Sequence, residues 1–201
     1  MKIESEEALR ALYGEKLARS VTKELTALDH HCRDFIAAAP YLVMSTVGAG
    51  GIDLTPRGDA PGFVVVEDDR TLLLPDRPGN NRLDALSNIL SNPRVGLIFL
   101  IPTIRETLRI RGRAEILHDP DLNARFAVKG KPALTVLKIS IDCAFIHCAK
   151  SALRSGLWDP DSWATERPIA PMSQLMNDHS NRSDPLESDE DMVKRYTTVL
   201  Y

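Results

Sequence analysis

The residues with the clearest chemical potential lie in a short turn between two apolar segments. An apolar run from Thr71 to Leu74 ends at Pro75-Asp-Arg-Pro-Gly-Asn-Asn-Arg82, and helical spacing of apolar residues follows at Leu83, Leu86, Ile89 and Leu90. We expect Asn80 and Asn81 to cap this helix and Arg82 to lie in its first turn. A helix N-terminus offers unpaired N–H groups, to which a guanidinium adds charged donors. The turn is therefore a candidate phosphate site, and a capped helix with a solvated arginine is the alternative interpretation that these residues alone favour.

A second basic segment, residues 105–116, is predicted to form a strand. With a period of two, one face carries Arg105, Thr107, Arg109, Arg111 and Arg113, and the other face is apolar apart from Gly112. Residues on one strand face are about 7 Å apart, so these arginines repel one another unless acids or an anionic ligand neutralise them. Three interpretations remain open: a solvated or subunit-contacting face with acidic partners, a site for a phosphorylated ligand, and an RNA surface.

Composition sets limits on the class of protein. The chain has 201 residues, 43% of them hydrophobic, and a net charge of -3, which suits one domain with a tail and gives no general basic field for nucleic acid. The longest apolar run, residues 95–102, is too short to span a bilayer. The acidic N-terminus has no apolar signal region, and the three cysteines form no Cys-x-x-Cys pair. We therefore expect a cytoplasmic protein with reduced thiols.

The order of elements predicts a mainly β fold with flanking helices. A helix is expected over Glu24–Ala39, ended by Pro40, and a short one from Asp119 and Pro120 to a stop at Gly130. Strands are expected over Tyr41–Val47, Gly62–Val66, Thr71–Leu74, Arg94–Ile101, Thr107–Ile116 and Leu134–Ile146. Their close spacing favours an antiparallel barrel. We divide the chain into an N-terminal extension (1–22), a barrel domain (23–160) and a polar C-terminal arm (161–201), peripheral or partly disordered.

Two further motifs have simpler explanations. The glycine run from Gly48 to Gly51 lacks the third glycine of a dinucleotide loop, because position 53 is Asp, and a hairpin turn is expected there. His30-His31-Cys32 and His147-Cys148 match no zinc spacing, and neighbours on a strand point to opposite faces. No metal site is expected.

The order and spacing of several motifs resemble a known family. They are Arg57-Gly-Asp-Ala-Pro-Gly62, Pro78-Gly-Asn-Asn-Arg82, Asn92-Pro-Arg-Val-Gly-Leu-Ile-Phe99 and the arginine segment up to Ala114. Together they resemble the pyridoxamine 5′-phosphate oxidase-like FMN-binding proteins with the split β-barrel fold, and in particular a bacterial branch of that family. The resemblance covers about residues 20 to 165.

The resemblance implies FMN as cofactor and a homodimer with two sites across the subunit interface. The residues matching the family's phosphate-binding positions are Arg57, Asn80, Asn81 and Arg82. Thr107 matches the strand position beside the flavin ring. Gly58, Asp59, Pro75 and Asp76 match strand ends whose backbone faces the ring. Arg109 or Arg111 would serve the ligand of the other subunit.

The chain departs from the oxidase proper near its end. That enzyme holds its vitamin B6 substrate with late basic and aromatic residues, for which Lys150, Arg154 and Trp158 are loose counterparts here. Flavin chemistry resides in the ring, so no side-chain acid or base is required; His147 is the nearest one, and the catalytic residues stay unassigned. We expect an FMN-dependent oxidoreductase for a small molecule. The alternatives are a deazaflavin or haem protein, a flavin carrier or sensor, and an RNA- or protein-binding module using the arginine face.

Overall fold

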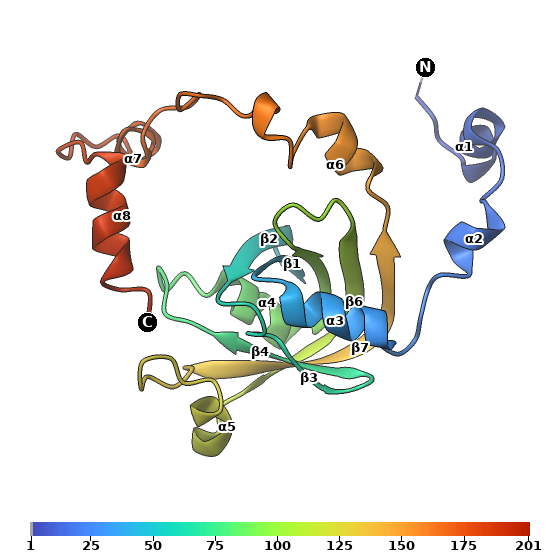
Figure 1. The fold of residues 1–201 in the computed structure, drawn as a ribbon, viewed down its shortest axis with the longest axis horizontal. Helices are drawn as coiled ribbons and strands as arrows, with labels where there is room; N and C mark the ends of the chain where they lie inside the picture. Colours follow the sequence, from blue (N-terminus) through green and yellow to red (C-terminus); the bar gives the residue numbers. More distant parts are fainter. Residues whose placement is uncertain (1) are drawn as a thin grey trace.

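A computed structural model describes residues 2–201, without the side chains of residues 19 and 20, as an open antiparallel split barrel (Figure 1). Its strands are β1 (Tyr41–Gly48), β2 (Gly51–Gly58), β3 (Val65–Asp68), β4 (Thr71–Asp76), β5 (Arg94–Leu100), β6 (Thr107–Leu117) and β7 (Thr135–His147). They form one sheet in the order β2-β1-β5-β6-β7-β4-β3, with every adjacent pair antiparallel. The predicted fold class is confirmed.

Alternation of burial explains how the sheet encloses its core. Along β6, the residues between the exposed arginines are buried, and in β1 Leu42, Met44 and Thr46 point inward. Phe99 and Ile110 are almost fully buried in the same cluster. Gly112 sits where the β6–β7 register shifts, and a Cβ there would lie 2.2 Å from the Ser140 carbonyl oxygen. This position requires glycine.

The glycine run joins β1 to β2 as the predicted hairpin, with Gly48 opposite Gly51. Helix α4 (Asp84–Ser91) packs on this hairpin. Asn88 Nδ2 donates to Thr46 Oγ1 at 3.1 Å, and a Cβ on Gly48 would lie 1.8 Å from Asn88 Oδ1. The hairpin thereby fixes α4, and with it the turn that precedes α4.

Two predicted helices differ in extent. The first, α3 (His30–Ala38), starts six residues later than expected because Asp29 caps it by accepting from Cys32 N at 2.8 Å. Residues 24–29 are not helical, and Leu25 exchanges backbone hydrogen bonds with Ala144 of β7. The second, α5 (Pro120–Ala124), is capped by Asp119 as predicted but ends well before Gly130.

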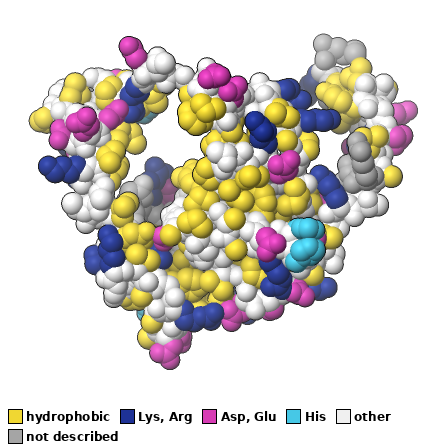
Figure 2. Space-filling model, viewed as in Figure 1, with side chains coloured by type: hydrophobic (Ala, Val, Ile, Leu, Met, Phe, Trp, Pro, Cys, Tyr) yellow, Lys and Arg dark blue, Asp and Glu magenta, His cyan; other side chains and the backbone are white. Residues whose placement is uncertain are grey.

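The remaining helices lie outside the barrel. They are α1 (Glu6–Tyr13), α2 (Ala18–Val21), α6 (Lys150–Ser155), the 3-10 turn η1 (Pro160–Ser162), α7 (Met172–Ser180) and α8 (Asp189–Thr197). The C-terminal arm, residues 161–201, is therefore partly helical, and it arches away from the barrel before its end returns to it (Figure 1). Figure 2 shows hydrophobic side chains over the barrel below this arch and charges of both signs on the arm. No helix in the described chain is long and apolar enough to cross a membrane.

Candidate functional site

A polar pocket of about 360 Å³ lies between β2, the end of β4 and the turn leading into α4. It brings together five of the residues proposed for the cofactor, which are Arg57, Asp76, Asn80, Asn81 and Arg82. The rest of its lining comprises Asp53, Leu54, Thr55, Arg77, Pro78, Gly79, Leu83, Asp84, Ala85, Leu86 and Leu134. Residues from three separate segments of the sequence thus form one concave, hydrogen-bonding surface.

Strand β2 supplies one wall of the polar pocket. Asp53, Thr55 and Arg57 alternate with exposed neighbours, so the strand period places all three on the partly buried face. Arg57 Nη1 donates to Asp76 Oδ1 at 2.7 Å, and the two side chains are 21% and 9% exposed. The Nε–H of Arg57 is buried and has no hydrogen-bond partner in the described chain. The Arg57 guanidinium, which lines the pocket, therefore has a donor that no group of the described chain satisfies.

Burial raises the pKa of the Asp76 carboxyl, while the charge and the hydrogen bond of Arg57 act in the opposite direction. Asp76 therefore depends on Arg57 to remain ionised near neutral pH at an acceptable energetic cost. This ion pair forms the floor of the pocket and links β2 to β4.

The turn before α4 differs from its prediction. Asn80 and Asn81 do not cap the helix, and Arg82 lies before it, because Asn81 and Leu83 adopt left-handed backbone with φ of 58° and 57°. Asn80 Oδ1 instead accepts from Arg82 N at 3.1 Å, which stabilises the turn itself. The helix begins at Asp84 with no side-chain cap.

Arg82 is 74% exposed and pairs with Asp84, with Nη2 2.7 Å from Oδ2. Because Asp84 lies in the first turn of α4, its carboxylate already interacts favourably with the positive end of the helix. The helix terminus and Arg82 therefore both carry an acidic partner. An anion entering here would add to, or displace, this partner.

Three of the residues assigned to strand ends lie outside the pocket lining. Pro75 is buried in the sheet opposite Val136, and Gly58 pairs with Tyr41. The Asp59 carboxylate accepts from Arg77 Nε at 3.0 Å and from the Tyr201 hydroxyl at 2.6 Å. Burial raises the pKa of Asp59, but hydrogen bonds from Tyr201, the Ala60 N–H and Arg77 outweigh this and lower it. The Asp59 side chain is therefore engaged by Arg77 and Tyr201.

A second cavity, the sheet-face pocket, has a volume of about 520 Å³ and contains Thr107 and Arg109. Its other lining residues are Val43, Ser45, Leu54, Gly96, Leu97, Ile98, Ile110, Arg111, His147 and Ser151. Leu54 lines both pockets, so they meet at the edge strand β2. Together they are complementary to a ligand that carries a phosphate at one end, for the polar pocket, and an apolar, planar group at the other end, for the sheet-face pocket.

His147 stands opposite Thr107 in the sheet-face pocket. Burial lowers the pKa of its imidazole, and the charges of Arg109 and Lys23 lower it further. The ring is therefore neutral at pH 7. Its buried Nδ1 has no hydrogen-bond partner in the described chain. His147 could accept or donate a single hydrogen bond to a ligand, and no carboxylate of the described residues holds it as a general base would require.

The arginine face has few acidic partners. Arg111 lies 3.3 Å from Glu24, whereas no carboxylate in the described chain pairs with Arg109 or Arg113. Arg109 packs 5.0 Å from the centroid of the Phe145 ring, and Arg113 stands directly opposite Arg94 of β5. Like charges opposite one another destabilise a sheet. This face therefore retains unneutralised positive charge.

The remaining candidates are not brought together. Lys150 and Arg154 are exposed on α6 and Trp158 is half-buried beyond it, and none of them lines either pocket. The three cysteines are free thiols, and burial raises the pKa of Cys32 to about 11. Within residues 2–201, no three His, Cys, Asp or Glu side chains gather to hold a metal ion.

Sequence reasoning missed several pocket residues. Thr55 and Asp53 share the strand period of Arg57, and this pattern alone would have found them. Arg77 follows directly after a strand end, the place where site residues often occur, but its role depends on contacts with Asp59 and Phe126 that are distant in sequence. Tyr201, which contacts Asp59 but does not line the pocket, has no local signal at all.

Comparison with known proteins identifies the family. The family model described as pyridoxamine 5′-phosphate oxidase matches residues 28–148, which include both walls of the polar pocket and the whole arginine face. The chain belongs to the pyridoxamine 5′-phosphate oxidase family. A search of curated proteins finds no match.

Solved structures with a similar fold include a candidate pyridoxamine 5′-phosphate oxidase from Lactobacillus delbrueckii, with 21% identity, a TM-score of 0.49, and 61% of this chain and 98% of that chain covered. HupZ from Group A Streptococcus has 19% identity and a TM-score of 0.48, with 59% and 93% covered. An FMN-binding protein from Syntrophomonas wolfei has 11% identity and a TM-score of 0.44, with 71% and 96% covered. The family assignment rests on the sequence match, and the fold on the sheet described above.

Proposed function

We propose that the protein binds FMN, with the phosphate in the polar pocket and the flavin ring toward the sheet-face pocket. The observation that carries the proposal is the buried, unpartnered Nε–H of Arg57 in a pocket that also holds Arg77, Arg82 and the amides of Asn80 and Asn81. Arginine offers five donors in a fork that matches phosphate oxygens, and one carboxylate leaves several of them free. The residues present therefore fit the group.

The acidic residues define how the phosphate would be held. Asp76 and Asp84 occupy one side of Arg57 and Arg82, so a phosphate would receive the remaining N–H groups of each guanidinium. Arg57 is held in place by its ion pair and would lose little side-chain entropy on binding. Arg82 is exposed and would exchange part of its contact with Asp84. We assign Arg57 as the main anchor and Arg82 as the closing contact.

The sheet-face pocket suits the ring system. Val43, Leu54 and Ile98 give apolar surface, and the Thr107 hydroxyl is a hydrogen-bonding group of the right size. When bound, the flavin would supply the electron-transfer chemistry. The chain's own residues bind and orient the ring and limit access of water to it. Gly58, Asp59, Pro75 and Asp76 are proposed to face the ring region through their backbone, as the family resemblance implies.

We further propose an oxidoreductase acting on a small anionic molecule at the arginine face. Arg109 has no carboxylate partner among the described residues, and it lines the sheet-face pocket together with neutral His147 and Ser151. A carboxylate or phosphate on the substrate would complete these contacts. Lys150, Arg154 and Trp158 stay proposals for the substrate side, because α6 lies beside this pocket through Ser151.

We propose that the protein works as a homodimer in the cytoplasm, and a substitution of Arg109 tests the dimer. We expect Arg109→Glu to lower dimer affinity or flavin occupancy by about tenfold, because the positive face would lose its complementarity with acidic groups of the partner subunit or with the anionic ligand. Sedimentation velocity and flavin absorbance of the purified variant measure both. Arg70→Glu, an exposed arginine in the β3–β4 turn, is the matched control and should change neither. A wild-type protein that is monomeric at micromolar concentration would contradict the two-subunit site.

The absorbance spectrum of the purified protein, before and after addition of FMN, tests the cofactor. Flavin, deazaflavin and haem absorb at different wavelengths, so each alternative cofactor gives its own spectrum. A bound flavin that no donor reduces would favour a carrier or sensor over an oxidoreductase. The unneutralised arginine face favours one other candidate, an RNA- or protein-binding module. That candidate predicts binding to polyanions with a steep dependence on salt and no bound chromophore.

A further inference from the structure

One residue makes the polar and ring contacts that fasten the end of the C-terminal arm to the barrel in the described chain. In the described chain, every hydrogen bond, ion pair and ring contact between residues 164–201 and the rest of the protein is made by Tyr201. The other polar contacts of this segment are internal, such as the pairs Arg167–Asp189 and Arg195–Glu187. The arm thus forms an arch that is attached at α6 and fastened again at Tyr201 (Figure 1).

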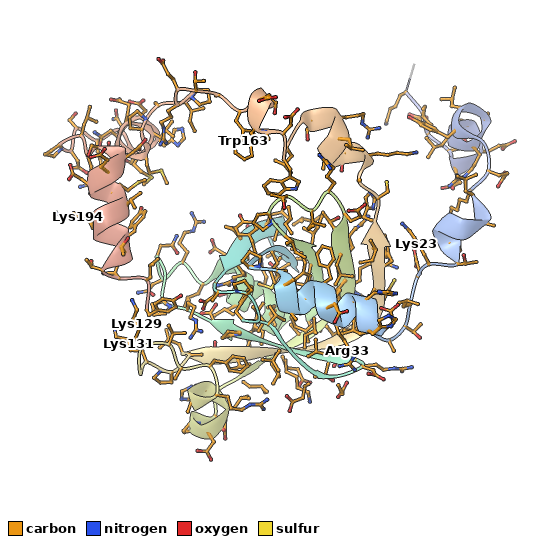
Figure 3. All side chains as sticks on the ribbon, in the orientation of Figure 1. Lys23, Arg33, Lys129, Lys131, Trp163 and Lys194 are labelled. Carbon is orange, nitrogen blue, oxygen red and sulfur yellow. The ribbon has the colours of Figure 1, made fainter. Side chains whose placement is uncertain are left out.

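The site that receives Tyr201 is specific. The phenol hydroxyl donates to Asp59 Oδ1 at 2.6 Å, and the ring lies 5.5 Å from the Arg77 guanidinium carbon and 5.8 Å from Lys129 Nζ. Lys131 Nζ donates to the Tyr201 carbonyl oxygen at 2.6 Å. Lys129 and Lys131 lie together near the end of the arm in Figure 3. A tyrosine suits this position, because it supplies a hydroxyl donor and a ring face for two cations.

This contact adjoins the polar pocket. Arg77 lines that pocket while donating to Asp59 from Nε at 3.0 Å and to the Phe126 carbonyl from Nη1 at 2.7 Å. Asp59 therefore holds Arg77 from one side and Tyr201 from the other. Restraining Tyr201 restrains Asp59 and Arg77, and with them the turn over residues 77–83 that forms one part of the pocket wall.

We propose that Tyr201 is a positioning residue that fastens the arm to the wall of the polar pocket, so that closure of the arm and binding of the FMN phosphate strengthen each other. The inference rests on the proposed function, because FMN is the ligand whose binding it modulates. Coupling of this kind is reciprocal: if the closed arm improves the pocket, the filled pocket must favour the closed arm by the same factor.

Protonation does not disturb the contact near neutral pH. The hydrogen bond to Asp59 raises the pKa of the Tyr201 phenol, and the bonds that Asp59 accepts, offsetting its burial, leave the pKa of its carboxyl below the usual value. The donor therefore stays protonated and the acceptor ionised between about pH 4 and pH 10. We therefore expect the contact between Tyr201 and Asp59 to respond to the ligand rather than to pH.

Two substitutions test the proposal through FMN affinity. Tyr201→Ala removes the hydroxyl and the ring and should weaken FMN binding about fivefold or more, the lower end of typical coupling between sites. Tyr201→Phe keeps the ring and should give a smaller loss. Tyr196→Ala is the matched control, because Tyr196 lies on α8 and its ring contacts Arg195 of the same helix. Unchanged FMN affinity in Tyr201→Ala would overturn the proposal.

A second measurement does not depend on affinity. Acetylation of Lys129 and Lys131, followed by mass spectrometry, reports whether the arm is closed. We expect both amines to react faster in Tyr201→Ala than in the wild type, and more slowly in the wild type when FMN is added. Wild-type protein that binds FMN without this protection would refute the coupling and leave the proposed function standing. Wild-type protein that binds no FMN would refute both.

Discussion

Arg57→Met is expected to weaken FMN binding by about 2–3 kcal/mol and to lower the free energy of unfolding by about 2–3 kcal/mol at neutral pH. The affinity falls because the variant loses the buried donor of the polar pocket. The stability falls because Asp76, at 9% exposure, loses the partner that compensates its buried charge. Calorimetric titration with FMN and chemical denaturation measure the two effects separately.

The double variant Arg57→Met/Asp76→Asn separates the two roles. Removing the buried charge should restore most of the stability, while FMN binding stays weak. The pH dependence has a definite sign. Burial already raises the pKa of Asp76, and loss of Arg57 raises it further, so the destabilisation is greatest above that pKa and shrinks as pH falls through it. A double variant that recovers FMN affinity would show that Arg57 acts only on the fold.

Arg82→Ala is expected to weaken FMN affinity by about 1.5–3 kcal/mol, which is the usual size of a charge-assisted contact. Thermal stability without FMN should change little, because Arg82 is exposed and its pairing with Asp84 is a surface ion pair. Fluorescence titration with FMN and thermal unfolding of the free protein measure these outcomes.

Asp84→Asn is the informative companion to Arg82→Ala. It removes the carboxylate that competes with a phosphate for Arg82 and for the N-terminus of α4, so FMN affinity should rise. If both variants bind FMN as the wild type does, the turn before α4 is not part of the phosphate site.

The strands could be predicted because a half-buried sheet imposes a period of two on its sequence. Every predicted strand is present within a few residues, and the face with Arg109, Arg111 and Arg113 is the exposed face of β6. The hairpin at Gly48 could be predicted equally well, since tight turns require particular residues. β2 carried a weaker pattern and was inferred through the hairpin and the family resemblance.

The turn before α4 could not be predicted in detail. Asparagine is favoured both as a helix cap and in left-handed turns, and the sequence does not distinguish these uses. The structure uses Asn81 in the second way, together with the rarer left-handed Leu83, so the helix starts at Asp84. The chemistry proposed for Arg82 survives this shift, but it acquires an acidic competitor that the expected cap did not include.

Contacts between distant segments could not be predicted from the sequence for a different reason. The pairs Arg57–Asp76 and Asp59–Tyr201 join residues whose separation in sequence carries no periodic signal. Leu25 illustrates the same limit, because helical spacing suggested a long helix over Glu24–Ala39, whereas a backbone pairing with β7 and the Asp29 cap divide that segment. Tertiary contacts decide such cases.

The central claim, a flavin phosphate held by the polar pocket, is tested most directly by comparing FMN with riboflavin in calorimetric titrations of the wild-type protein. The two ligands share the ring and differ in the phosphate. The account predicts that FMN binds at least about 100-fold more tightly than riboflavin, since two charge-assisted contacts are lost with the phosphate. Equal affinities, or no binding of FMN, would contradict it.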